Sequence, residues 1–158
     1  MKFHKPHRLK GFDYSSACSY LLTITTKGRA PILSKVIYRG MYEPSTVELL
    51  PYGTITEKYL LRIQDIYPNV TLDNYVIMPD HVHILPTIER SDAENKGTDK
   101  IIRATKAMIT REIGRSIWQT DFYDVIADTE ELFLRCDRYI DENPASWIER
   151  HGEPTAPK

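Results

Sequence analysis

The chain has 158 residues, of which 41% are hydrophobic and 27% are charged, and its formal net charge is −1. This composition is typical of an ordinary globular domain and argues against a disordered chain or a generic nucleic-acid binder. Apolar runs are too short to span a membrane and the first residues lack a signal peptide's apolar core, so we expect a cytoplasmic location. Cys18 and Cys136 lie far apart in the sequence, which favours two buried thiols over a disulfide.

Basic residues gather near the start of the chain and again in its second half. Residues 1–16 are basic and irregular, so we expect an N-terminal arm, followed by a single domain over 17–149 and a loose tail at 150–158. A solvated helix face explains most charge runs, so these residues indicate nucleic-acid binding only weakly. The residues expected to contact phosphates are Lys10, Lys100, Arg103, Lys106 and Arg111.

The first half of the chain predicts a strand and a helix. Alternating β-forming residues at 18–26 predict the strand. Residues 46–49 are compatible with a short strand, whereas the segment before them, up to Glu43, is ambiguous. Apolar side chains in 51–67 recur at helical spacing and predict a helix.

The second half predicts a hairpin, two helices and a further strand. Residues 70–88 form two β-rich runs around the turn residues Pro79 and Asp80. A helix is expected over 98–114 and a strand within 117–127.

A last helix is expected to begin within 128–131 and to end at Pro144, because a residue before proline is pushed out of the helical region. Asn143 would then lie at or next to the helix cap. Along the sequence, helices lie between strands that are expected to form an antiparallel sheet. This order favours an α+β sandwich of the ferredoxin-like type.

A His-x-His pattern lies at the start of the second hairpin strand. Because side chains alternate along a strand, His81 and His83 point to one face of the sheet, while Val82 and Ile84 point to the other. Imidazoles about 7 Å apart along a strand can share a metal ion. Taken alone, the pattern leaves two readings open: one or both histidines only form local hydrogen bonds, or both are metal ligands, in which case we expect them to face the surface.

The last predicted helix carries a second pair of candidates. Tyr139 and Asn143 are four residues apart and can share one helix face. A helical tyrosine is far more often a packing residue than a nucleophile. A phenol has a pKa of about 10, so at neutral pH it needs help to attack an electrophile, and a metal that polarises the electrophile gives such help.

Three ordered motifs resemble one protein family. Residues 78–85 read Met-Pro-Asp-His-Val-His-Ile-Leu, Trp118-Gln119 is followed by Phe-Tyr-Asp at 122–124, and 139–147 read Tyr-Ile-Asp-Glu-Asn-Pro-Ala-Ser-Trp. Together they resemble the REP-associated tyrosine transposases, which belong to the single-tyrosine HUH transposases. The resemblance runs from about residue 8 to residue 147.

The resemblance implies a role for each candidate. His81 and His83 match the two histidines that hold a divalent metal, Mg²⁺ or Mn²⁺, and Asn143 matches the carboxamide that completes the metal site. Tyr139 matches the nucleophile. Members have a ferredoxin-like core and cleave single-stranded DNA near imperfect hairpins, leaving a 5′-phosphotyrosine and a free 3′-hydroxyl. They need no nucleotide cofactor and act as monomers or as homodimers.

Two other readings of the sequence stay open beside this one. In the first, the chain is a catalytically silent module that binds single-stranded nucleic acid, which its weak basic balance favours. In the second, it is a metal-dependent phosphodiesterase in which water is the nucleophile and Tyr139 only packs. Covalent capture of DNA separates the transposase reading from both.

Overall fold

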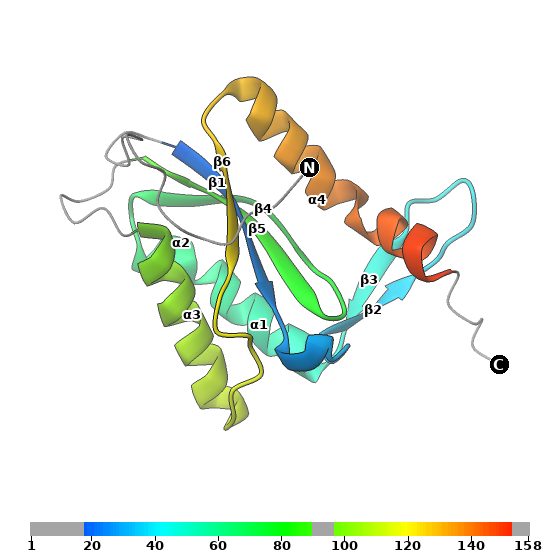
Figure 1. The fold of residues 1–158 in the computed structure, drawn as a ribbon, viewed down its shortest axis with the longest axis horizontal. Helices are drawn as coiled ribbons and strands as arrows, with labels where there is room; N and C mark the ends of the chain where they lie inside the picture. The colour runs from blue at the N-terminus through cyan, green and yellow to red at the C-terminus, as the bar shows by residue number, and fades with distance from the viewer. Residues whose placement is uncertain (1–17, 90–96, 153–158) are drawn as a thin grey trace.

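The computed structural model describes residues 18–89 and 97–152, so the predicted arm at 1–16, with Lys10, lies outside the described residues. Its centre is a four-stranded antiparallel sheet in the order β4-β5-β1-β6 (Figure 1). This order, with helices between the strands in sequence, confirms the ferredoxin-like α+β prediction. The strands are β1 (Cys18–Thr25), β4 (Val70–Ile77), β5 (His81–Ile88) and β6 (Tyr123–Ala127).

Helices cover both faces of this sheet, and each face has its own apolar core. Leu22 and Ile24 of β1 pack on one side with residues of α1 (Pro51–Leu61) and α3 (Gly97–Ile113). Leu21 packs on the other side against α4 (Glu130–His151). The alternation of side chains along β1 therefore separates α4 from the other long helices, as Figure 1 shows.

A second, two-stranded sheet lies beside the C-terminal half of α4. It consists of β2 (Ser34–Ile37) and β3 (Thr46–Leu49), joined antiparallel. Val36 of β2 and Val47 of β3 pack into the same core as α4. The short strand predicted at 46–49 is therefore confirmed, and β2 occupies part of the segment that the sequence left ambiguous.

Most other predicted elements are confirmed, with small differences in their bounds. The predicted helix at 51–67 is divided into α1 and the short α2 (Ile63–Ile66), and a 3₁₀ turn η1 (Lys27–Arg29) follows β1. The strand expected within 117–127 is limited to β6, and Trp118 forms only an isolated bridge with Thr26. Cys18 and Cys136 are buried and not joined by a disulfide, as predicted.

The predicted end of the last helix at Pro144 is wrong. The helix α4 begins after Thr129, whose side chain accepts a hydrogen bond from the Leu132 N–H, and it continues through Pro144 to His151. A proline inside a helix costs about 3 kcal/mol or more. Pro144 is itself buried, and Trp147 and Ile148 pack against the α4 core, so apolar burial offsets this cost.

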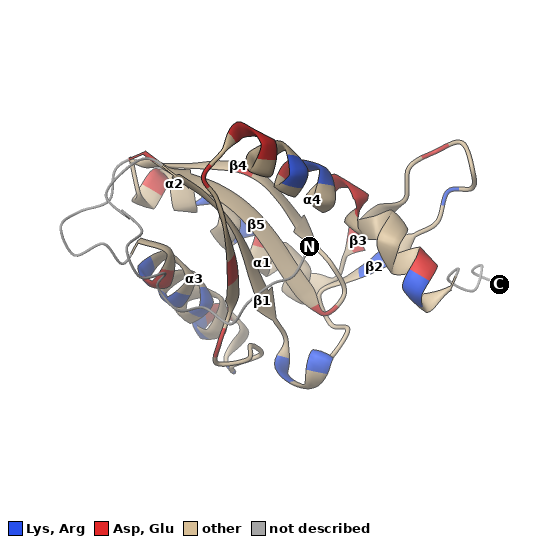
Figure 2. Ribbon diagram, turned by 45° about the horizontal axis from the view of Figure 1, so that its top comes forward, with Lys and Arg blue, Asp and Glu red and all other residues tan. Residues whose placement is uncertain are grey.

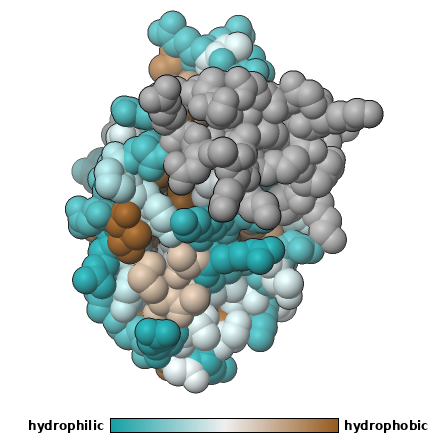
Figure 3. All heavy atoms as spheres, turned by 90° about the vertical axis from the view of Figure 1, so that its left-hand side faces the viewer, coloured by the Kyte–Doolittle hydropathy of each residue, from teal (hydrophilic) through white to brown (hydrophobic). Residues whose placement is uncertain are grey.

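One end of the molecule is largely polar where described residues form its surface. Figure 3 shows one end of the molecule, where hydrophobic atoms form only small, separate patches among the described residues. None of the described helices has the length and apolar character that crossing a membrane requires.

Candidate metal and nucleophile site

The two histidines of β5 lie under α4. Across β1, His81 is opposite Thr25 and His83 is opposite Thr23, and the two imidazole centroids are 4.7 Å apart. Their residues are only 6% and 3% exposed. The expectation that both histidines face the surface is therefore wrong, because the C-terminal half of α4 covers this face of the sheet.

A carboxylate fixes the orientation of the His81 ring. Nδ1 of His81 lies 2.6 Å from Asp80 Oδ1, and an ionised carboxylate only accepts hydrogen bonds, so Nδ1 carries the proton and the lone pair of Nε2 is left for another partner. Burial raises the pKa of Asp80, but the hydrogen bond from His81 and the charge of Arg29 lower it below its usual value overall. Arg29 Nε donates to Asp80 Oδ2 over 3.1 Å. This buried carboxylate is therefore ionised at neutral pH.

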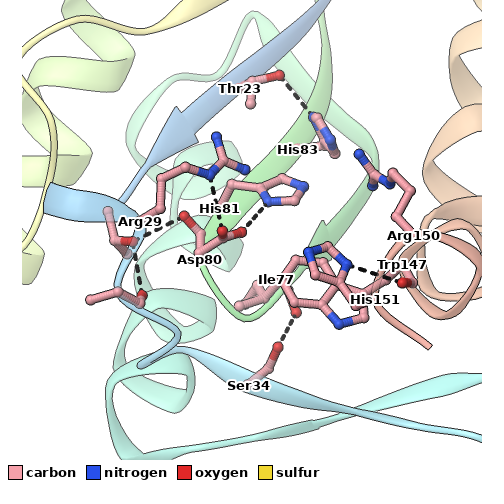
Figure 4. A network of polar contacts seen from close by, with 12 residues as sticks. Thr23, Arg29, Ser34, Ile77, Asp80, His81, His83, Trp147, Arg150 and His151 are labelled. Carbon is pink, nitrogen blue, oxygen red and sulfur yellow. Dashed lines mark hydrogen bonds and ion pairs between the residues drawn. The ribbon is translucent and has the colours of Figure 1, made fainter. Parts of the chain in front are cut away.

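The short hairpin turn is held by backbone bonds from neighbouring segments. The N–H of Thr26 donates to the carbonyl of Asp80, and the N–H of Leu33 donates to the carbonyl of Pro79. The Ser34 hydroxyl donates to the carbonyl of Ile77, just before the turn (Figure 4). The β4–β5 turn therefore presents Asp80 and His81 from a fixed backbone.

His83 is oriented by a hydroxyl and is held in its neutral form. Its Nδ1 lies 2.8 Å from Thr23 Oγ1 on the neighbouring strand (Figure 4). Burial, followed by the nearby His81 and the positive charge of Arg150, lowers the pKa of His83 well below 6.5. A neutral imidazole is the form that binds a metal. In the tautomer that carries the proton on Nδ1, Thr23 Oγ1 accepts this hydrogen bond and the lone pair of Nε2 is left for another partner, as in His81.

Three side chains at intervals of four residues on α4 lie over the histidines. The ring of Tyr139 is edge-on to His83 with centroids 5.2 Å apart, and the ring of Trp147 is 6.3 Å from His81. Asn143 lies between Tyr139 and Trp147 on the same face of the helix. The structure therefore brings the predicted nucleophile and the predicted metal ligands together.

Asn143 has a buried oxygen that lacks a hydrogen-bond partner among the described residues. Its Nδ2 donates to the carbonyl of Tyr139 over 2.9 Å, one helical turn earlier, whereas Oδ1 accepts no bond. The prediction that Asn143 lies at the helix cap is wrong, because the residue is inside α4 and 1% exposed. A buried unpaired carbonyl costs about 1–3 kcal/mol, which a bound cation would relieve.

The donor set fits a divalent cation. Within the described ranges no group of three or more His, Cys, Asp or Glu side chains could hold a metal. Two imidazoles and one amide oxygen are instead available, from His81, His83 and Asn143. Imidazole nitrogen and amide oxygen both ligate first-row divalent metals, and three protein donors leave coordination positions for substrate oxygens.

The predicted basic residues do not lie at this site. Lys100, Arg103, Lys106 and Arg111 belong to α3, which packs on the face of the sheet opposite α4 (Figure 2). The Arg103 side chain is 3.8 Å from Asp99, and Lys106 Nζ donates to the carbonyl of Gln119. Burial lowers the pKa of Lys106. Contacts between α3 and DNA stay a prediction.

Several residues at the site were not identified from the sequence. Thr23 and Arg150 have no motif of their own, although Thr23 is in phase with the histidines once the register of β1 and β5 is known. Tyr123 of β6 is directly opposite Thr23, so it lies on the face that carries His83. Trp147 belongs to the motif at 139–147, and its spacing of four residues from Asn143 indicates that the two side chains share one helix face. Tyr123 is thus a second tyrosine to test.

Comparisons with known proteins agree with this architecture. No protein-family model matches the chain. An uncharacterized protein of Haemophilus influenzae is 28% identical over 163 residues, which cover 89% of this chain and 87% of that protein. A solved structure of a REP-associated tyrosine transposase bound to a REP hairpin superposes with a TM-score of 0.64 at 16% identity, covering 96% of this chain and 76% of that one. The chain therefore has the fold of that transposase.

Proposed function

We propose that this protein is a single-tyrosine transposase that cleaves and rejoins single-stranded DNA, with Tyr139 as the nucleophile. One observation carries the proposal: Tyr139 and the unpartnered Oδ1 of Asn143 lie on the α4 face that covers His81 and His83. The shared fold with a transposase that binds a REP hairpin supports it. Fold likeness alone does not assign chemistry, so the side chains are the stronger argument.

The metal ligands in this proposal are Nε2 of His81, Nε2 of His83 and Oδ1 of Asn143, and the ion is Mg²⁺ or Mn²⁺. When bound, such an ion polarises a phosphodiester and neutralises part of its charge. Asp80 and Thr23 hold the imidazole rings through Nδ1. Outer partners of this kind preserve ligand orientation and commonly change metal affinity by about 10–100-fold when they are removed.

In the proposed reaction, Oη of Tyr139 attacks phosphorus and the bond from phosphorus to the 3′-oxygen breaks. The phenol gives up its proton to solvent, and the departing 3′-oxygen takes up a proton. The products are a 5′-phosphotyrosine and a free 3′-hydroxyl, so the energy of the phosphodiester is retained. Attack by a 3′-hydroxyl reverses the step and rejoins DNA without a nucleotide cofactor.

The proposed substrate is a single strand that carries a hairpin. The neighbouring transposase structure contains a REP hairpin, which suggests this class of DNA for the present chain. Unpaired nucleotides beside a hairpin leave a flexible phosphodiester that can enter a site partly covered by a helix. A fully matched duplex presents its backbone less freely, so we expect weaker binding.

Covalent capture tests the proposal. The protein is incubated with end-labelled hairpin oligonucleotides and Mn²⁺, denatured, and separated by size, with a chelator-treated sample in parallel. We expect a denaturation-resistant adduct that carries the fragment 3′ to the cut and that disappears with the chelator. Metal-dependent cleavage without an adduct would favour a hydrolase, and binding without cleavage would favour a silent DNA-binding module.

A further inference from the structure

A cation in the last turn of α4 points toward the proposed metal site. Figure 4 shows the guanidinium of Arg150 directed at the His83 ring. Its Nε donates to the carbonyl of Ser146 over a long 3.4 Å, and in the part of the chain that the structure describes it has no ion pair with a carboxylate. The residue is exposed, so the charged group is reachable from solvent.

The place of Arg150 on α4 and the direction of its side chain have different explanations. A basic residue in the last turn interacts favourably with the helix dipole, and this accounts for its place in the sequence. It does not account for the direction of the side chain toward the buried imidazole of His83, which Figure 4 shows. Its charge also contributes to the low pKa of His83, which agrees with the direction seen in Figure 4.

A guanidinium beside a divalent cation repels it unless an anion lies between them. A phosphodiester is such an anion, because its two non-bridging oxygens can contact both positive groups at once. The planar guanidinium fork matches two phosphate oxygens, and no carboxylate among residues 18–89 and 97–152 forms an ion pair with Arg150.

We propose that Arg150 binds the phosphate group that undergoes attack, sharing its oxygens with the cation at His81 and His83. This inference rests on the proposed function, since it names the group that holds the substrate phosphate. In the absence of phosphate, Arg150 weakens metal binding. In its presence, Arg150 strengthens the joint binding of metal and phosphate.

Binding measurements with Mn²⁺ alone and with inorganic phosphate test the inference without DNA or cleavage. Free Mn²⁺ is followed by electron paramagnetic resonance at low ionic strength, with phosphate–Mn²⁺ mixtures without protein as the reference. Arg150→Ala should raise the affinity for Mn²⁺ alone by about three- to tenfold. It should also abolish the gain in Mn²⁺ affinity that phosphate gives to the wild type.

Two further variants test whether the effects of Arg150→Ala come from the loss of this particular positive charge. Arg138→Ala removes an arginine from the exposed side of the same helix and should leave both measurements unchanged. Arg150→Lys keeps the charge, so its Mn²⁺ affinity without phosphate should match the wild type, while its phosphate effect is reduced.

The outcome also separates this inference from the proposed function. Unchanged or weaker Mn²⁺ binding by Arg150→Ala, or an intact phosphate effect, overturns the role of Arg150 even if Tyr139 forms the DNA adduct. The expected pair of changes supports that role even if no adduct is found. A wild type that binds no Mn²⁺ overturns both this inference and the proposed metal site.

Discussion

The phenol ring of Tyr139 meets the imidazole of His83 edge-on, with centroids 5.2 Å apart and planes inclined by 66°. One residue comes from the last helix and the other from a central strand, so only the packing of α4 on the sheet creates this contact. It places a phenol next to an imidazole that burial keeps neutral. This is the relationship on which the proposed metal-assisted attack by Tyr139 depends.

The hydrogen bond between Thr23 and His83 is predicted to preserve metal affinity. Thr23→Val keeps the shape of the side chain but removes the acceptor for Nδ1–H, so the ring loses its preferred tautomer and orientation. We expect Mn²⁺ affinity to fall by about 10–100-fold, measured by calorimetric titration. Thr71→Val, an exposed substitution on β4, is the control and should bind Mn²⁺ like the wild type. An unchanged affinity of Thr23→Val would remove Thr23 from the account.

We predict that Asn143 contributes to metal binding rather than to the stability of the metal-free fold. Asn143→Leu removes the buried Oδ1, which has no hydrogen-bond partner among the described residues, and this should stabilise the fold. It also removes the one hydrogen bond that Nδ2 donates to the Tyr139 carbonyl, and this should destabilise the fold. The free energy of unfolding without metal should therefore stay within about 1 kcal/mol of the wild type. The increase in Tm on adding Mn²⁺ should disappear. A large loss of stability with intact Mn²⁺ stabilisation would assign Asn143 a structural role instead.

The stability of the metal-free protein is predicted to fall in mild acid. The pKa of His83 in the folded protein lies well below 6.5, so below about pH 6.5 the unfolded chain binds the proton more readily and the free energy of unfolding decreases. Urea unfolding with a chelator, from pH 7.5 to 5, should show this slope. In His83→Gln the slope over this interval should be smaller. An equal slope in His83→Gln over this interval would assign the effect to other titrating groups instead.

The sequence was sufficient to predict the hairpin, the two histidines and their shared face, because these depend on the local alternation of a strand. It was also sufficient to pair Tyr139 with Asn143, because four-residue spacing is a local property of helices. Local rules failed at Pro144. There the cost of an internal proline is offset by packing of Trp147 and Ile148 on the sheet, which no local pattern shows.

The same distinction explains which site residues were missed. Burial of the histidines, the hydrogen bond between His83 and Thr23 and the direction of Arg150 all depend on how α4 and β1 lie against β5. Conversely, the basic residues of α3, which indicate nucleic-acid binding only weakly in the sequence, lie across the sheet from Tyr139. Charged residues in a sequence predict an exposed surface, but only the fold shows where on the molecule that surface lies.

Tyr139 is the proposed nucleophile, and Tyr123 is the other tyrosine whose position makes it a candidate for that role. Tyr123 lies on the sheet face that carries His83, yet the ring that contacts His83 is that of Tyr139. Tyr139→Phe and Tyr123→Phe each remove one hydroxyl and are matched in size. We expect Tyr139→Phe to bind Mn²⁺ and hairpin DNA normally without forming an adduct, and Tyr123→Phe to form one.

The most direct measurement is mass spectrometry of the wild-type adduct after protease and nuclease digestion. We expect one modified peptide, with a 5′-linked phosphonucleotide on Tyr139. A modification on Tyr123 or on any other residue would contradict the proposed mechanism.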